Sequence, residues 1–348
     1  MWGLSTLLGE TLSGVYKLPP VLSEVCVQVP ASIANLGVGF DTFSLALTKP
    51  FIKVTVTRAR PKTRRLIITG PFSKQVTRSR LLHAGAKALA ASYRRFKISS
   101  GYVLRIEVNI PPRKGLGLSG AEAVGAVLCT NRLFHLNMKK DDVANLAAQA
   151  EPSNHMDNVA ASTFGGFNIV TPSASAQLRH VTTIPPPVDL GVALIIPDVE
   201  KASTEATRKV LPTLVVRDKY VEALGYASRI AWAFAEGDTG ALIETLPWDP
   251  VIEPARAQAG VYGSGIDAKF LQEEKRALLE KFHVAETISG GGPSRALWFR
   301  VDRTGLVQEA VQFVSDRLRS RGYRTRHVII TRPSRNGAAV VAERSVRR

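Results

Sequence analysis

The sequence predicts a protein of mixed helices and strands, folded into two lobes with a cleft between them. Its 348 residues exceed the roughly 250–300 residues at which a single hydrophobic core stops growing. Segments with strand periodicity and segments with helix periodicity follow one another along the whole chain. Three consecutive prolines at 185–187 separate the two halves. One large α/β unit is the alternative that the length leaves open.

The first half of the chain predicts four strands and three helices. Alternation of apolar and polar residues marks strands at 25–29, 51–56 and 102–110, and another strand is expected at 167–170. Helices are expected at 81–96, 121–134 and 141–151. The second of these helices is rich in small residues and free of proline, which favours close packing against a sheet. The third has acidic residues in its first turn, where they complement the helix dipole.

The second half predicts a further alternation of strands and helices. An apolar run at 192–196 follows the prolines, and strands are also expected at 286–289, 296–299 and 327–331. Helices are expected at 218–236, 240–246, 269–281 and 304–319. We therefore divide the chain into an N-terminal extension (1–22), an N-terminal lobe (23–185) and a C-terminal lobe (186–348).

The composition is that of a folded, soluble protein, with 45% hydrophobic and 22% charged residues. No apolar run approaches the roughly 20 residues of a membrane-spanning helix. The first residues have no basic start and contain Glu10, which argues against a signal peptide and favours the cytoplasm. Cys26 and Cys129 lack metal-ligand spacing, so we expect two buried thiols in a reducing compartment.

The formal charge of +17 raises the question of a nucleic-acid partner. The basic residues fall in separate groups, 58–65, 94–97 and 317–326, and none of them matches a known nucleic-acid-binding pattern. This distribution favours a solvated basic surface that attracts anionic substrates, and makes a nucleic-acid partner the less favoured alternative.

The strongest local signal is a glycine-rich loop between a predicted strand and a predicted helix, Pro111-Pro-Arg-Lys-Gly-Leu-Gly-Leu-Ser-Gly-Ala121. Glycines let backbone N–H groups turn toward an anion, and a helix N-terminus adds the positive end of its dipole. The spacing is not that of a Walker loop. The loop alone is equally compatible with a plain tight turn.

Three further segments change this interpretation. Residues 30–42 combine two glycines with Asn35 and Asp41, His155-Met-Asp-Asn158 precedes Gly165-Gly-Phe167, and Ile288-Ser-Gly-Gly-Gly-Pro-Ser294 is a second glycine-rich turn. In this order, the segments resemble those of the GHMP kinases over almost the whole chain. The resemblance implies an α+β fold of two lobes, with an N-terminal lobe like ribosomal protein S5 domain 2 and a ferredoxin-like C-terminal lobe.

Within that superfamily the motifs are most similar to those of homoserine kinases. Residues 30–42 match that family's Pro-Ala-Ser-x-Ala-Asn-Leu-Gly-x-Gly-Phe-Asp-Thr motif at every stated position. His155-x-Asp-Asn158, the segment Ser203 to Pro212 and Glu253-Pro-Ala-Arg256 resemble further elements of the family. The resemblance implies ATP-dependent phosphorylation of the homoserine hydroxyl in threonine biosynthesis, with a homodimer as a candidate assembly.

The resemblance also implies roles for individual residues. Asn35 and Arg208 are the catalytic candidates. The ATP-binding candidates are Pro111, Arg113, Lys114, Gly115, Leu116, Gly117, Leu118, Ser119 and Gly120. The substrate-binding candidates are Asn35, Asp41, His155, Asp157, Asn158, Thr204, Arg208 and Arg256. Among these, Asn35 and Asp41 would hold the hydroxyl and amino groups, and the two arginines would bind the carboxylate. Opposite charges at the two ends are what an amino acid requires.

The resemblance also implies magnesium at Ser119 and Glu151, and hard oxygen ligands together with nucleotide phosphates are what this ion prefers. Two departures from the family's loop stand out: Leu118 replaces a hydroxyl residue, and Glu122 places an acid in the first turn of the following helix. Glu122 is either a second metal ligand or a stabilising first-turn acid. Other kinases of the superfamily, acting on L-threonine, pantoate or an isoprenoid precursor, stay open, as does a non-catalytic relative that binds nucleic acid.

Overall fold

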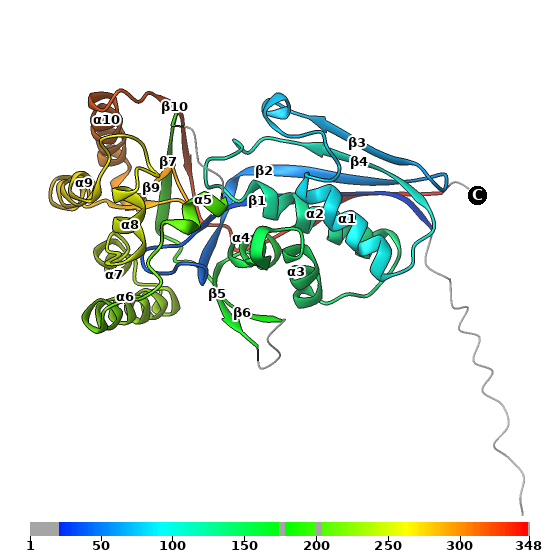
Figure 1. Ribbon diagram of the computed structural model, residues 1–348, viewed down its shortest axis with the longest axis horizontal. Helices are drawn as coiled ribbons and strands as arrows, with labels where there is room; N and C mark the ends of the chain where they lie inside the picture. Colours follow the sequence, from blue (N-terminus) through cyan, green and yellow to red (C-terminus); the bar gives the residue numbers. More distant parts are fainter. Residues whose placement is uncertain (1–20, 174–177, 200–203, 347–348) are drawn as a thin grey trace, which may run out of the picture.

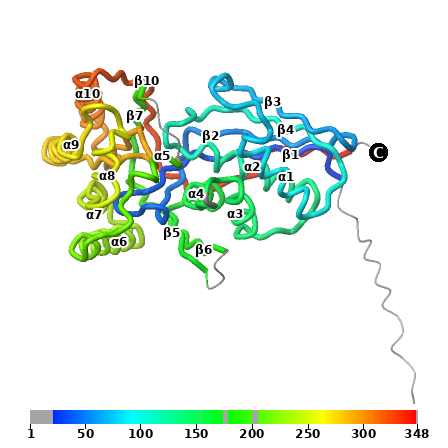
Figure 2. The backbone as a smooth tube through the Cα atoms, viewed as in Figure 1, coloured from blue at the N-terminus to red at the C-terminus, as the bar shows by residue number. Residues whose placement is uncertain are grey.

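The structure, a computed structural model, describes residues 21–173, 178–199 and 204–346. Its elements form an elongated molecule in which the long strands β1 (Leu22–Ala34) and β2 (Phe43–Ala59) run from one end toward a group of helices at the other (Figure 1). Figure 2 shows that the chain returns at its end, where the red trace lies beside the blue first strand.

The first part of the molecule is built on a seven-stranded sheet. Its main path has the order β11-β1-β2-β4-β3, and β5 and β6 continue it from β2. Neighbouring strands are antiparallel, except that β3 and β4 are parallel. The bounds of the remaining strands are β3 (Arg64–Thr69), β4 (Gly101–Glu107), β5 (Phe167–Pro172), β6 (Arg179–Ile184) and β11 (Ala339–Ser345). Because β11 pairs with β1, the last strand of the chain belongs to the sheet of the first part.

Four helices lie on one face of this sheet (Figure 1): α1 (Ala84–Arg95), α2 (Leu118–Leu133), α3 (Lys140–Ala148) and α4 (Asp157–Phe164). Helices α2 and α4 pack against β1 and β2. A Cβ at Gly125 of α2 would lie 2.5 Å from Val54, so the helix backbone approaches the sheet as closely as only glycine permits. The predicted close packing of this small-residue helix is confirmed.

The second part contains a four-stranded antiparallel sheet of order β10-β7-β9-β8. Its strands are β7 (Leu190–Pro197), β8 (Ala285–Ile288), β9 (Arg295–Arg300) and β10 (Thr325–Thr331). Strand β7 is buried on both faces, as its continuous apolar sequence predicts. Val192 and Leu194 belong to the core shared with the first part, whereas Ala193 and Ile195 belong to a second core with α9 and α10.

Short and long helices complete the second part. The α-helices are α5 (Thr204–Lys209), α6 (Arg217–Glu236), α7 (Thr239–Thr245), α8 (Ile252–Gln258), α9 (Ala268–Phe282) and α10 (Thr304–Ser320). Short 3₁₀ helices lie at Ser73–Gln75, Pro152–Asn154 and Val301–Arg303. All predicted helices and strands are present, and the structure adds β3, β6, β11, α4, α5 and α8. The division of the chain at 185/186 stays a prediction.

No helix in the described ranges combines the length and apolar character required to cross a membrane. Both cysteines are free thiols. Cys129 is buried, and burial raises the pKa of its thiol. Cys26 is only half-buried, so the expected burial holds for one thiol and not for both.

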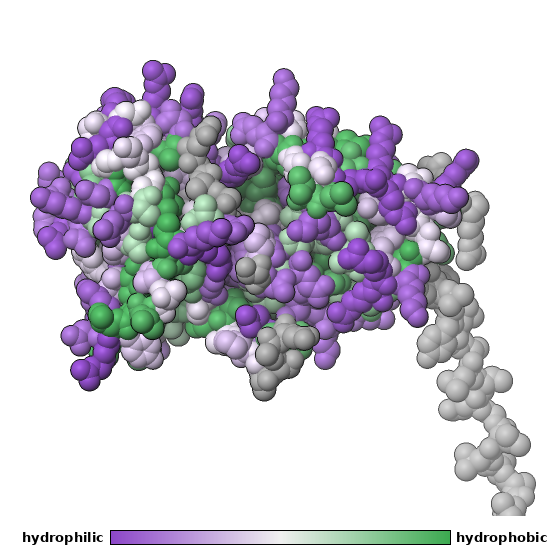
Figure 3. Space-filling model, in the orientation of Figure 1, coloured by the Kyte–Doolittle hydropathy of each residue, from purple (hydrophilic) through white to green (hydrophobic). Residues whose placement is uncertain are grey.

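Figure 3 shows hydrophilic side chains over much of the visible surface, in keeping with the high charge. Some of the arginines nevertheless make contacts within the protein. The Arg58 guanidinium lies 4.3 Å from the centroid of the Phe134 ring and donates to the Leu133 carbonyl (2.8 Å). Arg64 lies over the Tyr102 ring. Part of the basic group at 58–65 therefore serves packing.

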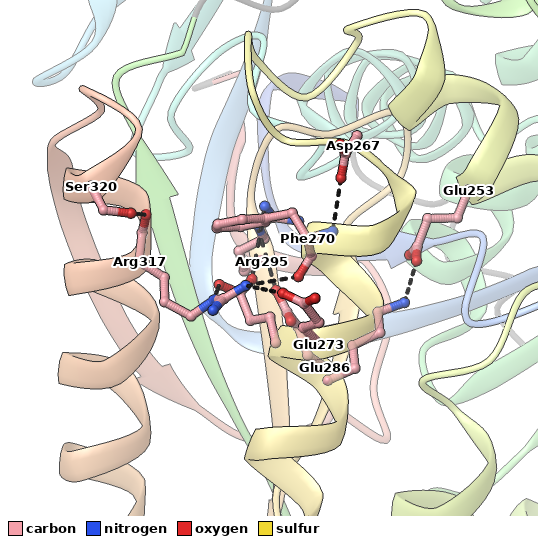
Figure 4. A network of polar contacts seen from close by, with 10 residues as sticks. Glu253, Asp267, Phe270, Glu273, Glu286, Arg295, Arg317 and Ser320 are labelled. Carbon is pink, nitrogen blue, oxygen red and sulfur yellow. Dashed lines mark hydrogen bonds and ion pairs between the residues drawn. The ribbon is translucent and has the colours of Figure 1, made fainter.

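The C-terminal part also contains charged side chains that are buried or half-buried, shown in Figure 4. We call this set the C-lobe ion network: Glu253, Glu274, Lys275, Glu286, Arg295 and Arg317. Glu274 and Glu286 are fully buried, and Arg295 lies between them, with its Nε 3.5 Å from Glu286 and an Nη atom 3.9 Å from Glu274. Arg317 donates to Glu274 at 3.1 Å. Burial, followed by the neighbouring Glu274 carboxylate, raises the pKa of the Glu286 carboxyl to about 8.

We expect Glu286→Gln to flatten the pH dependence of the free energy of unfolding. In the unfolded chain this carboxyl ionises near its ordinary pKa of 4.5, whereas in the folded protein it stays protonated up to about 8. The unfolded state thus loses its proton first, and the wild type loses stability as the pH rises through this window. Glutamine has no proton to lose. Urea unfolding of both proteins between about pH 5 and pH 8 measures the difference, and parallel curves would contradict the assignment.

Candidate active site

A cavity of about 540 Å³, which we call the central cavity, is lined by residues from both parts of the molecule. The turn after β1, the loop before α2, the start of α4, helices α5 and α8, and the turn after β8 all contribute to its wall. Most of the predicted site residues line it: Asn35, Asp41, Arg113, Gly115, Gly117, Leu118, Ser119, Glu151, His155, Asp157, Asn158, Arg208 and Arg256. The fold therefore brings together segments that are far apart in the sequence.

The glycine-rich loop ends at the start of α2 and lines the cavity there. Gly117 is the N-cap of α2 and has a left-handed backbone (φ 69°). The first N–H groups of a helix have no acceptor within the helix, and they carry the positive end of its dipole. Leu118 and Ser119 are at these positions and line the cavity. This geometry suits phosphate groups.

The structure adds a second reason for two glycines of this loop to the one that the sequence predicts. A Cβ at Gly115 would lie 2.0 Å from the Ser289 carbonyl oxygen, and a Cβ at Gly117 would lie 2.0 Å from the Ser32 hydroxyl. Both residues also have positive φ. The protein's own packing thus requires glycine at both positions, in addition to the approach of backbone N–H groups to an anion that the sequence predicts.

We expect Gly117→Ala to lower the free energy of unfolding by about 2 kcal/mol, because it combines a left-handed backbone with a clash against Ser32. Urea unfolding measures this loss. Gly237→Ala is the matched control, since Gly237 has a similar φ of 71° but no atom within 4 Å of an added Cβ. Equal losses in the two variants would show that the contact with Ser32 has no energetic weight.

Four predicted ATP-binding residues do not line the central cavity. The side chain of Leu116 is buried in the core, and Gly120 is buried in the first turn of α2. Pro111 and Lys114 line a neighbouring cavity, and the Lys114 ammonium donates to the carbonyls of Pro197 and Val199 at 2.8 and 2.7 Å. Lys114 thus joins the loop to the end of β7.

Ser119 and Glu151, the predicted magnesium ligands, face each other. The Ser119 hydroxyl donates to Glu151 Oε2 at 3.0 Å, and His155 Nε2 lies 3.4 Å from the same oxygen. Burial raises the pKa of the Glu151 carboxyl, an effect that His155 and Ser119 oppose. Its other oxygen, Oε1, is buried without a hydrogen-bond partner. A hydroxyl and an unsatisfied carboxylate beside a phosphate-binding loop fit Mg²⁺, which takes one or two carboxylates together with phosphates.

Glu122 also lines the cavity but is only 4% exposed. Its Oε1 lies 3.4 Å from Nε2 of the buried His83, at the N-cap of α1. Burial, followed by the Glu151 carboxylate, raises the pKa of Glu122 well above its ordinary value, and burial lowers the pKa of His83 to about 4. Because α2 begins at Leu118, Glu122 lies beyond the first turn of the helix, and its interpretation as a first-turn acid is wrong. Its burial beside His83 favours a structural role between α1 and α2, and a role as a metal ligand stays a prediction.

The turn after β1 places Asn35 and Asp41 side by side. Both have left-handed backbones, with φ of 61° and 56°, which Asn and Asp tolerate better than most residues. The Asn35 side-chain oxygen accepts from the Asp41 backbone N–H at 3.0 Å. The Asp41 carboxylate pairs with the Arg208 guanidinium of α5 at 2.6 Å. The first motif and the predicted arginine are thus in direct contact.

Arg256 of α8 reaches the same region. It is 3% exposed and donates to the carbonyls of Thr207 and Gly290, both at 3.4 Å. The guanidinium groups of Arg208 and Arg256 lie 5.2 and 5.1 Å from the centroid of the same ring, that of Phe40. The two arginines that are predicted to bind the substrate carboxylate, which we call the clamp arginines, therefore lie close together in the cavity wall.

His155, Asp157 and Asn158 line the cavity at the start of α4. Asn158 accepts from the Ser32 hydroxyl at 2.8 Å, and its backbone N–H donates to Asp157. Asp157 is buried, and burial raises the pKa of its carboxyl. These contacts are with other protein groups. The side chain of Thr204 lies outside the described residues, so its predicted contact with substrate stays a prediction.

The sequence analysis missed several cavity residues, including Phe40, Thr207 and Gly290. Phe40 lies inside the first motif and Gly290 inside the second glycine-rich turn, so the motifs themselves could have indicated them. Gln75, Val76 and Thr77 also line the cavity, and nothing in their sequence pattern indicates a site.

The class that this fold and cavity define is a kinase of the GHMP superfamily: residues 80–166 match GHMP kinases N terminal domain. The homoserine kinase of Halorubrum lacusprofundi is 32% identical over 313 residues, 87% of this chain and 96% of that protein. The homoserine kinase of Methanococcus vannielii is 29% identical over 277 residues, 78% of this chain and 87% of that protein. The chain belongs to the homoserine kinase family.

The fold comparison agrees with the sequence comparison. The crystal structure of homoserine kinase from Cytophaga hutchinsonii matches with a TM-score of 0.75 at 22% identity, over 97% of this chain and 100% of that chain. This likeness confirms the predicted two-lobed α+β fold.

Proposed function

We propose that this chain transfers the terminal phosphoryl group of ATP to the hydroxyl of L-homoserine, forming O-phospho-L-homoserine for threonine biosynthesis. The observation that carries the proposal is that one cavity holds both an anion-binding helix start, at Ser119, and charged groups of both signs, at Asp41 and Arg256. The first suits a nucleotide, and the second suits an amino acid. The two relatives from Methanococcus vannielii and Halorubrum lacusprofundi are both homoserine kinases, which supports the same assignment.

The charged groups would hold the two ends of homoserine. Asp41 would bind the ammonium group, and the two arginines would bind the carboxylate, since a guanidinium offers a planar fork to a carboxylate. Arg208 already pairs with Asp41, so it would bridge that residue and the substrate. The hydrogen bonds of Arg256 are long, at 3.4 Å, and therefore weaker than the pair of Arg208 with Asp41. The Arg256 guanidinium is thus the freer of the two to turn toward the substrate carboxylate.

Asn35 and Arg208 would act nearest the reacting atoms. The Asp41 N–H occupies the side-chain oxygen of Asn35, which leaves the amide donors of Asn35 for the homoserine hydroxyl. Arg208 would offset negative charge that develops during transfer. Phosphoryl transfer has a loose transition state, so orientation and neutralisation by such groups account for most of the catalysis. His155, Asp157 and Asn158 would form the supporting wall.

Ser119 and Glu151 would hold Mg²⁺ beside the nucleotide phosphates. When bound, the ion neutralises phosphate charge and orients the terminal phosphoryl group. The Ser119 hydroxyl and Glu151 Oε2 are hydrogen-bonded to each other, and both residues line the cavity. Arg113 and Leu118 would form the adjacent wall of the nucleotide site.

ATP consumption with a panel of acceptors tests the proposal. The panel contains L-homoserine, L-threonine, pantoate and mevalonate, each at several concentrations with magnesium present. We expect L-homoserine to have the highest kcat/KM. Preference for another acceptor would replace homoserine by that substrate. No phosphoryl transfer to any acceptor, together with salt-sensitive binding of nucleic acid, would overturn the proposal of a kinase.

A further inference from the structure

An ion pair between a half-buried carboxylate and a buried ammonium joins the helix that carries Arg256 to α9. The Glu253 carboxylate, at the start of α8, contacts the Lys275 ammonium of α9. Figure 4 shows the Glu253 side chain turned toward this contact, which is drawn as a dashed line. Arg256 is three residues further along α8 and lines the central cavity. Helix α8 therefore carries the ion pair and a clamp arginine one turn apart.

Lys275 ties two points of the chain to α9. Its side chain is 2% exposed, and its ammonium also donates to the Pro247 carbonyl at 2.6 Å. The segment between these points is short and ordered by Asp249, whose carboxylate accepts from the backbone N–H groups at the beginning of α8: those of Val251, Ile252 and Glu253. One ammonium thus fixes both the approach to α8 and its first turn.

The Arg256 guanidinium depends on this placement of the backbone. Its hydrogen bonds to the Thr207 and Gly290 carbonyls are 3.4 Å long, and its other neighbours are the Phe40 ring and the Tyr262 side chain, to which it is hydrogen-bonded. Such contacts do not hold a long side chain against movement of its helix. A displacement of about 1 Å in a substrate-positioning group costs up to about 100-fold in rate.

We infer that Lys275 is a positioning residue for the amino-acid end of the substrate: through Glu253 it holds α8 where Arg256 meets the carboxylate. The inference rests on the proposed function. Lys275 itself does not line the central cavity; it lies in the wall of a separate cavity with Glu253 and Pro247. Its partner Glu253, by contrast, lies beside Arg256, and both line another small cavity. The effect of Lys275 on homoserine must therefore pass through α8.

Arg317 provides a matched control within the same network. It pairs with Glu274 at 3.1 Å and donates to the Phe270 carbonyl at 2.9 Å, which joins α10 to α9. These contacts do not involve α8. Arg317→Met removes a cation from the C-lobe ion network and lowers stability, but it should leave the KM for homoserine unchanged.

The test is a double-mutant cycle of Lys275→Met with Arg256→Met. In the wild-type background we expect Lys275→Met to raise the KM for homoserine about tenfold, with the KM for ATP changed by less than about twofold. In the Arg256→Met background the same substitution should raise the KM for homoserine by less than about twofold, because the group that it positions is already absent. Steady-state kinetics with each substrate varied in turn measures all four proteins.

Three results would overturn the inference. In the double variant, the KM for homoserine would rise by the product of the two single effects. Alternatively, Lys275→Met would change the KM values for homoserine and ATP equally, or Arg317→Met would raise the KM for homoserine as much as Lys275→Met does. If Lys275→Met does not fold, Glu253→Gln with Lys275→Met removes both charges and avoids an unpaired, half-buried carboxylate. The wild-type arm reports on the proposed function separately. If the wild type does not turn over homoserine, both the proposed function and the role of Lys275 are wrong. If the wild type turns over homoserine normally but the two substitutions act independently on KM, only the role of Lys275 is wrong.

Discussion

Replacement of Ser119 by alanine is expected to lower kcat by about 100-fold or more, the usual cost of one positioned group at a reacting phosphate or oxyanion. The hydroxyl lies at the first turn of α2 and donates to Glu151 at 3.0 Å, so its removal would take away one of the two proposed magnesium ligands and release the carboxylate that faces it. Turnover at saturating homoserine, measured over a series of magnesium concentrations, gives the loss and its dependence on the ion.

Ser92→Ala is the matched control for this variant. Ser92 is a fully buried serine of α1 whose hydroxyl donates to the Ala88 carbonyl of its own helix, outside the cavity. Ser92→Ala should lose about 0.5–1.5 kcal/mol of stability, and Ser119→Ala, whose hydroxyl bonds a carboxylate, about 1.5–3 kcal/mol. Only the Ser119 variant should lose turnover. Wild-type turnover of Ser119→Ala at saturating magnesium would remove this residue from the mechanism.

The periodicity of the sequence was sufficient for most of the fold, because strands and helices with one buried face carry that face in their residue order. It failed where the local pattern is weak. Strand β3 begins with Arg64 and Arg65, which hide its alternation, and every residue of β11 is exposed. Strand β11 pairs with β1 more than 300 residues earlier in the chain, and no local signal reports such a pairing.

In the candidate site, too, the sequence indicated the features that depend on local backbone conformation and missed those that depend on contacts between distant segments. The glycine-rich loop and the first motif were visible because glycine and short polar side chains are required by backbone conformations, and these requirements are local. The contact of Asp41 with Arg208 was not visible, since 167 residues separate them. Nor could spacing separate Leu118, which lines the cavity, from Leu116, which is buried in the core, because that depends on how the loop is seated against Ser32 and Ser289.

Replacement of Arg256 by lysine is expected to weaken homoserine binding about tenfold or more, with little effect on ATP. Lysine keeps the charge but lacks the planar fork, a loss of about 1.5–3 kcal/mol for a hydrogen bond to a charged group in a dry site. The site is dry by this measure, since Arg256 is 3% exposed. Arg229→Lys is the matched control, because Arg229 makes an exposed pair with Glu244 outside the cavity.

Homoserine amide turns this prediction into a test of the clamp itself. It has the same hydroxyl and ammonium groups as homoserine but no negative charge for Arg208 and Arg256 to meet. The wild type should therefore prefer the acid strongly, and Arg256→Lys should lose most of that preference because acid and amide then meet a group without the bidentate fork. Arg229→Lys should keep the full preference. If the wild type phosphorylates acid and amide equally well, or if Arg256→Lys discriminates as the wild type does, the carboxylate is not bound by this pair, and the charges at the cavity no longer select an amino acid.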